Sequence, residues 1–230
     1  ISLLERRIER LTLGLKTLKS SERDAAFKNI ETLKQLQEDL ENGIPFRDRD
    51  LDAAQQNAIS DTFTISSLPL LVALNIGEDE IPRTPDIENE VSSLLEGRLT
   101  GGTAICGSLE AELAGMSEAE ETEMREELNV GESGLSRMIK LSYEVLGLAS
   151  FLTVGEDETR AWTIPNGALA PKAAGVIHSD LERGFIRAET VSYQDFIDAG
   201  SIAEARNRGQ YRQEGRDYVV EDGDIINFLF

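Results

Sequence analysis

The first forty residues carry apolar side chains at the alternating spacing of three and four that indicates a coiled-coil seam. One run consists of Ile1, Leu4, Ile8, Leu11, Leu15 and Leu18, and a second of Ala26, Ile30, Leu33 and Leu40, with Gln37 as the polar exception. Ser20-Ser21-Glu22 forms a turn with capping character between the runs, and Gly43 and Pro45 stop the second helix. Because helices this short are marginal alone in water, we expect an antiparallel hairpin that closes on its own seam.

The middle of the chain reads as strand, helix and strand. Residues 68–75 form a continuous apolar run, which predicts a strand buried on both faces of a parallel sheet. A helix is expected at 87–96, and a second strand at 103–106. Polar residues follow both strands, at the carboxyl edge where open α/β sheets bind their ligands. Residues 117–128 are expected to form an acidic, solvated helix, and 135–146 a helix leading into the next domain.

From about residue 148 the pattern changes to short strands and helices. Paired strands are expected at 151–154 and 160–164, joined by the turn Gly155-Glu156-Asp157-Glu158. The remaining expected elements are a helix at 170–177, a strand at 185–191, and a hairpin of 218–220 with 224–228 about Asp222-Gly223. A small mixed sheet crossed by a helix is a β-grasp arrangement.

Charge and composition exclude several classes of function. The formal net charge of -20 disfavours indiscriminate binding to nucleic acid, DNA included, because phosphates are repelled. Most of the acid lies in residues 51–147, which carry 19 acidic and five basic side chains, whereas the first twenty residues are locally basic. No apolar run is long enough to cross a membrane. The single Cys106 forms no internal disulfide, which favours a reducing cytoplasm.

Several kinds of catalytic centre are excluded by residue type. No Gly-x4-Gly-Lys-Ser/Thr phosphate loop is present, and Gly14-Leu15-Lys16-Thr17 is rejected because Leu15 belongs to the helical seam. One Cys and one His cannot assemble a zinc site or a catalytic thiol. His178 is therefore interpreted as structural or partner-facing. We expect no catalytic and no metal-binding residue in these 230 residues.

Three segments carry a family resemblance. Asn75-Ile76-Gly77-Glu78 resembles the Asn-Lys-x-Asp base-recognition element of GTPases, with Ile for Lys and Glu for Asp. The run from Cys106 to Leu113, CGSLEAEL, resembles the element SAKLEAEL of YchF-type Obg-like ATPases, which belong to the TRAFAC class of P-loop GTPases. Segments 151–156, 160–164, 170–189 and 215–228 resemble the TGS domain of that family almost word for word.

The resemblance implies an architecture and a base site. The fold class is α/β with a helical hairpin arm: residues 1–63 form the coiled-coil arm, 64–147 the C-terminal part of a parallel-sheet nucleotide domain, and 148–230 a TGS β-grasp domain. The adenine site maps to Asn75, the backbone of Ile76 and Glu78, with Ser108 and Leu109 nearby. Guanine selectivity should be weak, because Glu78 is longer than the aspartate that reads guanine.

Function follows from the same resemblance. It implies a cytoplasmic ATPase that engages the ribosome or ribosomal RNA and hydrolyses ATP, or GTP, with Mg²⁺ when intact. The chain lacks a starting Met and opens within a helical pattern, which indicates a cut end. With the phosphate loop missing, we expect this polypeptide to be an inactive, monomeric fragment that binds no nucleotide tightly. The alternative is a non-catalytic adaptor that binds partners through its arm and TGS domain.

Two basic groups are candidates for the partner surface. The first is Arg6, Arg7 and Arg10 with Lys16 and Lys19, all off the helical seam and so expected to face solvent. The second gathers Arg183 and Arg187 near His178, with Arg206, Arg208, Arg212 and Arg216 further along the chain. The alternative is that these side chains are ordinary solubilising charges paired with nearby Glu.

Overall fold

The computed structural model describes the chain except Phe63, Glu96, Arg98, Glu156 and Asp157, and excludes the side chains of Ser20 and Ser21. Two units have their own internal contacts, Ile1–Val145 and Leu146–Phe230. The elements of the first unit are α1 (Ser2–Gly14), α2 (Ser20–Glu41), α3 (Ala53–Ile59), β1 (Leu70–Asn75), α4 (Thr84–Leu94), β2 (Thr100–Ile105), α5 (Gly107–Leu113), α6 (Glu118–Leu128) and α7 (Gly134–Leu146).

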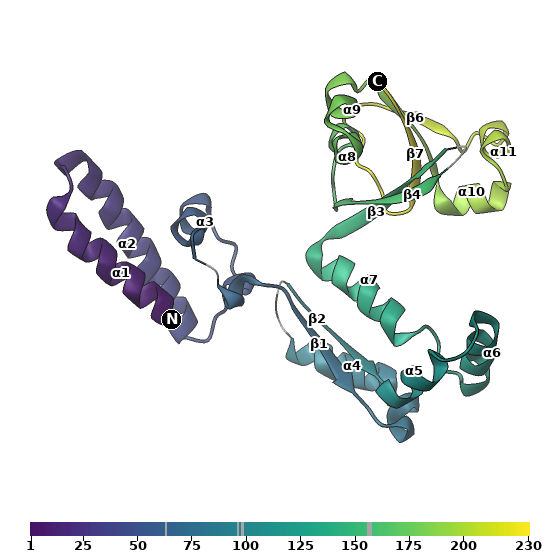
Figure 1. The fold of residues 1–230 in the computed structure, drawn as a ribbon, viewed down its shortest axis with the longest axis horizontal. Helices are drawn as coiled ribbons and strands as arrows, with labels where there is room; N and C mark the ends of the chain where they lie inside the picture. Colours follow the sequence, from purple (N-terminus) through teal and green to yellow (C-terminus); the bar gives the residue numbers. More distant parts are fainter. Residues whose placement is uncertain (63, 96, 98, 156–157) are drawn as a thin grey trace. The chain divides into compact units, whose positions relative to one another are not determined.

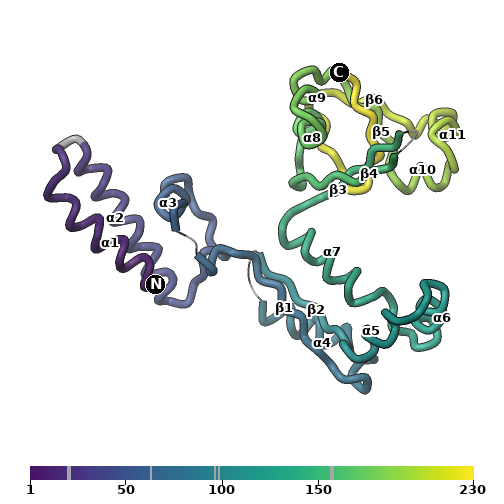
Figure 2. The backbone as a smooth tube through the Cα atoms, in the orientation of Figure 1, coloured from purple at the N-terminus to yellow at the C-terminus, as the bar shows by residue number. Residues whose placement is uncertain are grey.

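The expected hairpin is present as the antiparallel pair α1 and α2 (Figure 2). Its buried contacts come from Leu4 of α1 and from Ile30, Leu33 and Leu36 of α2. Leu36 lies one position before the expected polar exception Gln37, so the second seam continues with an apolar residue. The predicted turn at residues 20–22 is wrong, because α2 already begins at Ser20 and the chain reverses over residues 15–19.

A short apolar cluster closes the base of the hairpin. Phe46, Ala58 and Ile59 pack with Leu4, Leu33 and Leu36. The helix α3 that supplies two of them begins with a capping box, in which the Asp52 carboxylate accepts from the Gln55 N–H at 2.8 Å and the Gln55 side-chain oxygen accepts from the Asp52 N–H at 3.0 Å.

Strands β1 and β2 pair in parallel, from Leu70 with Thr100 to Asn75 with Ile105. Two adjacent glycines in β2 allow helices to approach both faces. A Cβ on Gly101 would lie 2.8 Å from side-chain atoms of Leu141 and Val145 in α7, and one on Gly102 would lie 2.3 Å from Val91 Cγ1 in α4. Because successive residues of a strand face opposite sides, α7 and α4 cover opposite faces of β2.

The prediction that β1 is buried on both faces is wrong. Leu70 and Leu74 are 36% and 42% exposed, and the only described strand that pairs with β1 is β2. The helix after β1 also begins and ends earlier than expected: a 3₁₀ turn at Glu78–Arg83 leads directly into α4, and Glu96 lies outside the described residues.

The second unit is a five-stranded mixed sheet in the order β4-β3-β7-β5-β6 (Figure 1). Only the β3–β7 pair is parallel. Its elements are β3 (Leu148–Val154), β4 (Thr159–Pro165), α8 (Ala170–Ile177), α9 (Ser179–Gly184), β5 (Arg187–Ser192), α10 (Tyr193–Ala199), α11 (Ile202–Asn207), β6 (Arg212–Glu214) and β7 (Asp224–Leu229). The core between α8 and the sheet contains Phe151, whose ring meets that of Phe228 edge-on at 5.6 Å.

The strand pair and the helix at 170–177 are confirmed, and the turn residues Glu156 and Asp157 lie outside the described residues. The predicted hairpin of 218–220 with 224–228 is wrong. Val219 makes one bridge, to Leu169, while β7 pairs with β5 and β3. The turn before β7 is held by buried Asp224, which accepts hydrogen bonds from the Tyr218 hydroxyl at 2.6 Å and the Glu221 N–H at 3.0 Å.

The architecture is therefore α/β with a mixed sheet. Within the part of the chain that the structure describes, no helix is both long and apolar enough to cross a membrane.

Candidate functional site

The candidate base site is built from the two loops that follow β1 and β2. Asn75 is the last residue of β1, and its side-chain oxygen accepts a hydrogen bond from the Gly107 N–H at 3.0 Å. A Cβ on residue 107 would lie 3.0 Å from the same oxygen, so glycine allows the close approach. The parallel register places the ends of both strands at one sheet edge, which is why these polar residues meet.

A second hydrogen bond joins the same loops. The Ser108 hydroxyl, in the first turn of α5, donates to the Glu78 carboxylate at 3.2 Å. Cys106 Sγ lies 3.3 Å from the same hydroxyl oxygen. The structure thus brings together three of the expected base-site side chains, those of Asn75, Glu78 and Ser108, and all three are exposed to solvent.

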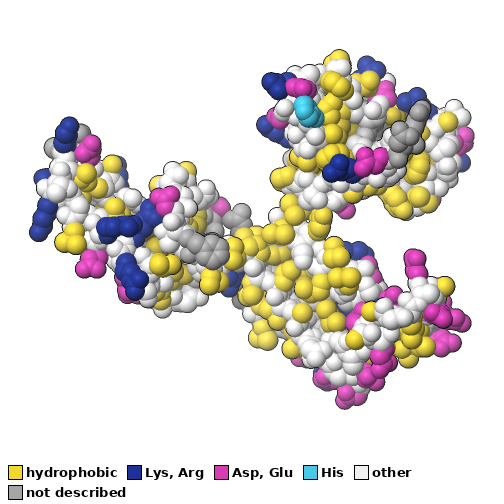
Figure 3. Space-filling model, in the orientation of Figure 1, with side chains coloured by type: hydrophobic (Ala, Val, Ile, Leu, Met, Phe, Trp, Pro, Cys, Tyr) yellow, Lys and Arg dark blue, Asp and Glu magenta, His cyan; other side chains and the backbone are white. Residues whose placement is uncertain are grey.

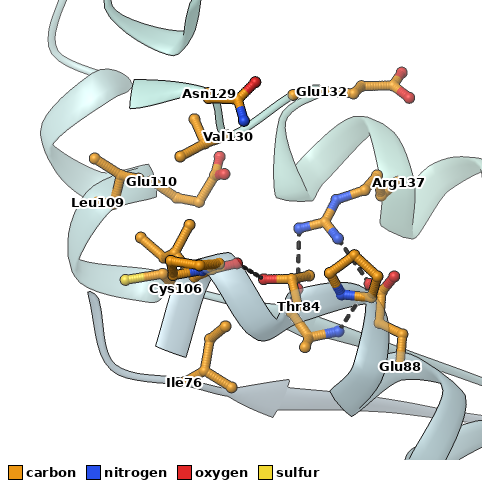
Figure 4. A pocket seen from close by; sticks show the side chains of 15 residues that line it. Ile76, Thr84, Glu88, Cys106, Leu109, Glu110, Asn129, Val130, Glu132 and Arg137 are labelled. Atoms are coloured by element: carbon orange, nitrogen blue, oxygen red, sulfur yellow. Dashed lines mark hydrogen bonds and ion pairs between the residues drawn. The ribbon is translucent and has the colours of Figure 1, made fainter. Parts of the chain in front are cut away.

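The other two residues of that set face a neighbouring cavity. Ile76 and Leu109 line a hollow of about 490 Å³ together with Cys106, Glu88, Glu110 and Arg137 (Figure 4). The walls also include Glu132, so that three carboxylates stand against one guanidinium. A surplus of negative charge repels phosphate, so this cavity is a poor site for the phosphate groups of a nucleotide.

A network that the sequence did not suggest crosses the wall of this cavity. The Glu88 carboxylate of α4 accepts hydrogen bonds from Arg137 at 2.7 Å, the Thr103 hydroxyl at 2.7 Å and the Ala104 N–H at 3.1 Å. Arg137 of α7 also donates to the Ala104 carbonyl at 2.9 Å. Figure 4 shows the two charged side chains facing each other from different helices. Both backbone groups of Ala104 are satisfied by this pair.

A second ion pair holds α6. Arg125 donates to both Glu110 carboxylate oxygens, at 3.2 and 2.8 Å, and to Glu121 at 2.7 Å. No residue of α6 is buried, so these bonds rather than apolar packing keep the helix in place. Burial of Glu110 opposes ionisation, but the hydrogen bonds from Arg125 and the Gly134 backbone, together with the charges of Arg125 and Arg137, outweigh it, and the pKa of this carboxyl is held below its ordinary value.

Replacing Glu110 with Gln is expected to loosen α6 in a pH-dependent way. A carboxyl whose folded pKa is lowered stabilises the fold above its unfolded pKa, and this contribution is lost as pH falls through the folded pKa. At pH 7 the amides of α6 should lose about tenfold in hydrogen-exchange protection, for a part-buried charged hydrogen bond of about 1.5 kcal/mol. Below about pH 4 the difference between variant and parent should shrink.

The matched control is Glu123→Gln, which changes an exposed carboxylate on α6 itself. Equal exchange rates for α6 in the two variants at pH 7 would show that the pair of Arg125 and Glu110 does not hold this helix.

The basic side chains of the hairpin do not share one environment. Arg6, Arg10, Lys16 and Lys19 are exposed, and the described residues contain no ion-pair partner for them. Arg7 corrects the expectation of solvent exposure: its side chain is 14% exposed, donates to the Thr62 hydroxyl at 2.7 Å and lies 3.6 Å from Asp61. Arg7 lies beside the seam, and its long side chain extends to the base of the hairpin. The spacing of apolar residues in the sequence does not indicate such a contact.

The basic residues of the second candidate group have partners. Arg183 donates to Asp180 at 2.7 Å, and Arg187 lies 3.8 Å from Glu189. The His178 ring nitrogen accepts from the Asp180 N–H at 3.2 Å, so this residue caps the short helix α9. Acidic partners also lie beside Arg206, Arg208 and Arg212, and Arg216 donates to the Phe185 carbonyl. These contacts are those expected of solubilising charges.

Comparison with known proteins gives consistent matches. Residues 148–230 match the family YchF-GTPase_C, described as "Protein of unknown function (DUF933)". The ribosome-binding ATPase YchF of Bacillus subtilis is 41% identical over 229 residues, which cover 99% of this chain and 62% of that protein. Obg-like ATPase 1 of Gallus gallus is 40% identical over 188 residues, which cover 80% of this chain and 46% of that protein.

A solved structure agrees. The Schizosaccharomyces pombe YchF GTPase superposes with a TM-score of 0.76 at 28% identity, covering 99% of this chain and 63% of that one. The chain thus spans about three-fifths of the length of the Bacillus subtilis and Schizosaccharomyces pombe proteins.

Proposed function

Because the chain belongs to the YchF family of Obg-like ATPases, we propose that it is part of a ribosome-associated ATPase and supplies the base-recognition edge of its nucleotide site. The observation that carries this proposal is the pair of hydrogen bonds between the loops after β1 and β2. They place Asn75, Glu78 and Ser108 together at the sheet edge where nucleotides bind in α/β domains.

The exposed groups fit one edge of a purine. The Glu78 carboxylate accepts hydrogen bonds only, and the Asn75 amide group both donates and accepts. Ile76 is only 6% exposed as a whole residue and its N–H donates to the Ile105 carbonyl at 3.0 Å, so its own carbonyl is the backbone group proposed to contact the base. ATP is preferred to GTP in this proposal, because Glu78 is longer than the aspartate that reads both guanine donors. Bound Mg-ATP would supply the phosphoanhydride that is cleaved, and residues outside these 230 would hold its phosphates.

The open side of β1 supports a larger nucleotide domain. Leu70 and Leu74 are exposed, and β2 is its only described partner. Further strands of the complete protein would pair with the free edge of β1, and further helices would cover Leu70 and Leu74. In this proposal residues 1–63 are the arm, 64–147 the C-terminal part of the nucleotide domain, and 148–230 a TGS β-grasp domain, in a cytoplasmic monomer.

The test compares two polypeptides, the 230-residue chain and a full-length protein with a phosphate loop. The short chain is expected to show no ATP turnover above the blank, since positioning and charge neutralisation at the phosphates supply most of phosphoryl-transfer catalysis. The long one is expected to hydrolyse ATP and to prefer ATP over GTP in competition binding.

Two outcomes would contradict this proposal. Turnover by the short chain, with contamination excluded, would mean that it holds an unrecognised phosphate site. A tenfold or greater preference of the long protein for GTP would show that the base loop has been misinterpreted. Ribosome binding by a full-length protein without any turnover would instead favour the adaptor.

A further inference from the structure

The five-stranded sheet of the second unit has two unlike edges. Strand β6 at one edge has three residues, of which Arg212 and Glu214 form an ion pair at 3.4 Å. Strand β4 at the other edge has seven, and β3 is the strand it pairs with among those described. Short strands and charged side chains protect a sheet edge against further pairing, and they do so at β6. The longer edge of β4 is open to another strand.

The bonds at the two ends of the β3–β4 pair fix which backbone groups of β4 point outward. The Gly155 N–H donates to the Glu158 carbonyl at 2.8 Å, and the Asn166 N–H donates to the Gly147 carbonyl at 2.7 Å. Bonded and non-bonded pairs alternate along an antiparallel ladder, and the register between these two ends is unbroken. The even-numbered residues of β4 therefore bond β3, and the backbone groups of the odd-numbered ones face the free edge.

Thr159 and Ala161 thus present N–H and C=O groups at this edge. Both residues are exposed, and no bond to these outward groups occurs within the described part of the chain. Pro165, which has no N–H, closes the edge at the carboxyl end of β4. Donors and acceptors at strand spacing are complementary to the backbone of another extended chain. A phosphate backbone offers acceptors but no donors, so a peptide fits this edge better than nucleic acid does.

The face of β4 toward α8 indicates which side chains the peptide carries. Trp162 and Ile164 pack on the core under α8, and the guanidinium of Arg160 lies 4.3 Å from the centre of the Trp162 ring. A hollow of about 400 Å³ lies between the end of β4 and α8, with Ile164 and the exposed Val176 in its walls. A chain paired with β4 places alternate side chains on this face.

Two positions of the added chain follow from this alternation. An apolar side chain opposite Ile164 would reach the hollow. A carboxylate opposite Arg160 would meet a guanidinium that has no ion-pair partner among the described residues. The edge therefore favours a segment that is apolar at one end and acidic at the other.

We propose that β4 binds an extended peptide segment of a partner protein by antiparallel strand addition. Its apolar, β-branched side chains lie toward α8, and an acidic side chain lies opposite Arg160. Antiparallel pairing is the more stable arrangement per residue. The nucleotide site takes no part, so peptide binding and nucleotide binding can fail independently.

The experiment measures fluorescence anisotropy of the amidated peptide Val-Thr-Val-Thr-Glu-Thr, with fluorescein at its N-terminus, on the 230-residue chain. Antiparallel pairing places its two Val opposite Ile164 and Trp162, and its Glu opposite Arg160. The parent is expected to bind. Ala161→Pro should weaken binding about tenfold, because it removes an outward N–H that makes no bond to β3. The control Ala161→Thr keeps this N–H and should bind as the parent does.

A second variant leaves the backbone unchanged. Arg160→Glu should weaken binding of this peptide by about threefold, the effect of one cross-strand charge pair. A peptide with Lys in place of Glu should show the opposite preference, binding Arg160→Glu better than the parent. This charge exchange tests the register of the added strand even if Ala161→Pro disturbs folding.

Three results would overturn the proposal. The first is that the parent does not bind the peptide. The second is equal binding by the parent and by a folded Ala161→Pro, or equal affinities of both peptides for the parent and Arg160→Glu. The third is a dimer of the parent in analytical ultracentrifugation that Ala161→Pro abolishes, which would show that the edge pairs with a second copy of the chain.

Discussion

Replacing Arg137 with Met is expected to lower the free energy of unfolding of the Ile1–Val145 unit by about 3 kcal/mol. The guanidinium bonds the Glu88 carboxylate at 2.7 Å and the Ala104 carbonyl at 2.9 Å. Methionine keeps the apolar stem of the side chain but removes both bonds. The carboxylate, 31% exposed, would then lose its counter-charge while still facing β2.

The expected loss of stability is large because the hydrogen bonds of Glu88 and Arg137 go to buried backbone groups. Glu88 and Arg137 together satisfy the N–H and C=O of Ala104, which is fully buried. Buried backbone groups without a partner are costly, and the pair acts on β2 as a neighbouring strand would. Arg137 also joins α7 to α4, the helices on opposite faces of β2, so its loss should loosen both.

The measurement is denaturant unfolding followed by circular dichroism, with a matched control on the same helix. Lys140→Met removes an ion pair with Glu132 in which the side chains are 67% and 42% exposed, and should cost less than about 0.5 kcal/mol. Trp162 is the only tryptophan and lies in the second unit, so its fluorescence transition should be unchanged in both variants. Equal costs for Arg137→Met and Lys140→Met would show that the network contributes no more than a surface ion pair.

The elements predicted well from sequence are those whose signal is local. The helix at 170–177 follows a turn and has a regular apolar face, and its bounds agree with α8. The meeting of the loops after β1 and β2 was also accessible from the sequence, because polar residues directly after an apolar run indicate the carboxyl edge of a strand. What the sequence could not indicate was the bond between Ser108 and Glu78, which depends on loops 30 residues apart.

The elements that were predicted wrongly depend on distant partners. Asp222-Gly223 is a strong hairpin signal, yet β7 pairs with β5 and β3, because its apolar residues fill the centre of a five-stranded sheet. The apolar run of β1 indicates burial, but no described element covers Leu70 and Leu74. Glu88 and Arg137 lie 49 residues apart among many charged residues, and no periodicity distinguishes them from solvated ones.

Reversing Arg6 and Arg10 to Glu is expected to weaken binding of the full-length protein to ribosomes by roughly 10- to 100-fold at low salt. The two residues are four apart on α1, so they lie on one face of the helix. Both are exposed, and the described residues include no ion-pair partner for either. Figure 3 shows dark-blue side chains on the hairpin, while magenta gathers around α6. Unpaired guanidinium groups are free to neutralise phosphates, whereas the basic side chains of the second candidate group already have partners.

Arg7 is left out of this variant for a structural reason. Its guanidinium bonds Thr62 and lies beside Asp61 at the base of the hairpin, so reversing its charge would disturb folding and mimic a binding defect. The matched control is the double reversal of Arg183 and Arg208, which carries the same charge change. Because these two are already paired with Asp180 and Glu204, the control should reduce binding much less.

Salt dependence separates contact with phosphate from a general charge effect. Each phosphate contact contributes about 0.7 to 0.9 to the slope of log affinity against log salt, so losing two should flatten the slope by about 1.4 to 1.8. The measurement is co-sedimentation with ribosomes across a salt series for the parent, the Arg6/Arg10 variant and the control. If the arm faces ribosomal RNA, affinity and slope fall together in the arm variant alone. Unchanged affinity and slope in that variant would instead make the hairpin a structural arm whose basic residues serve solubility.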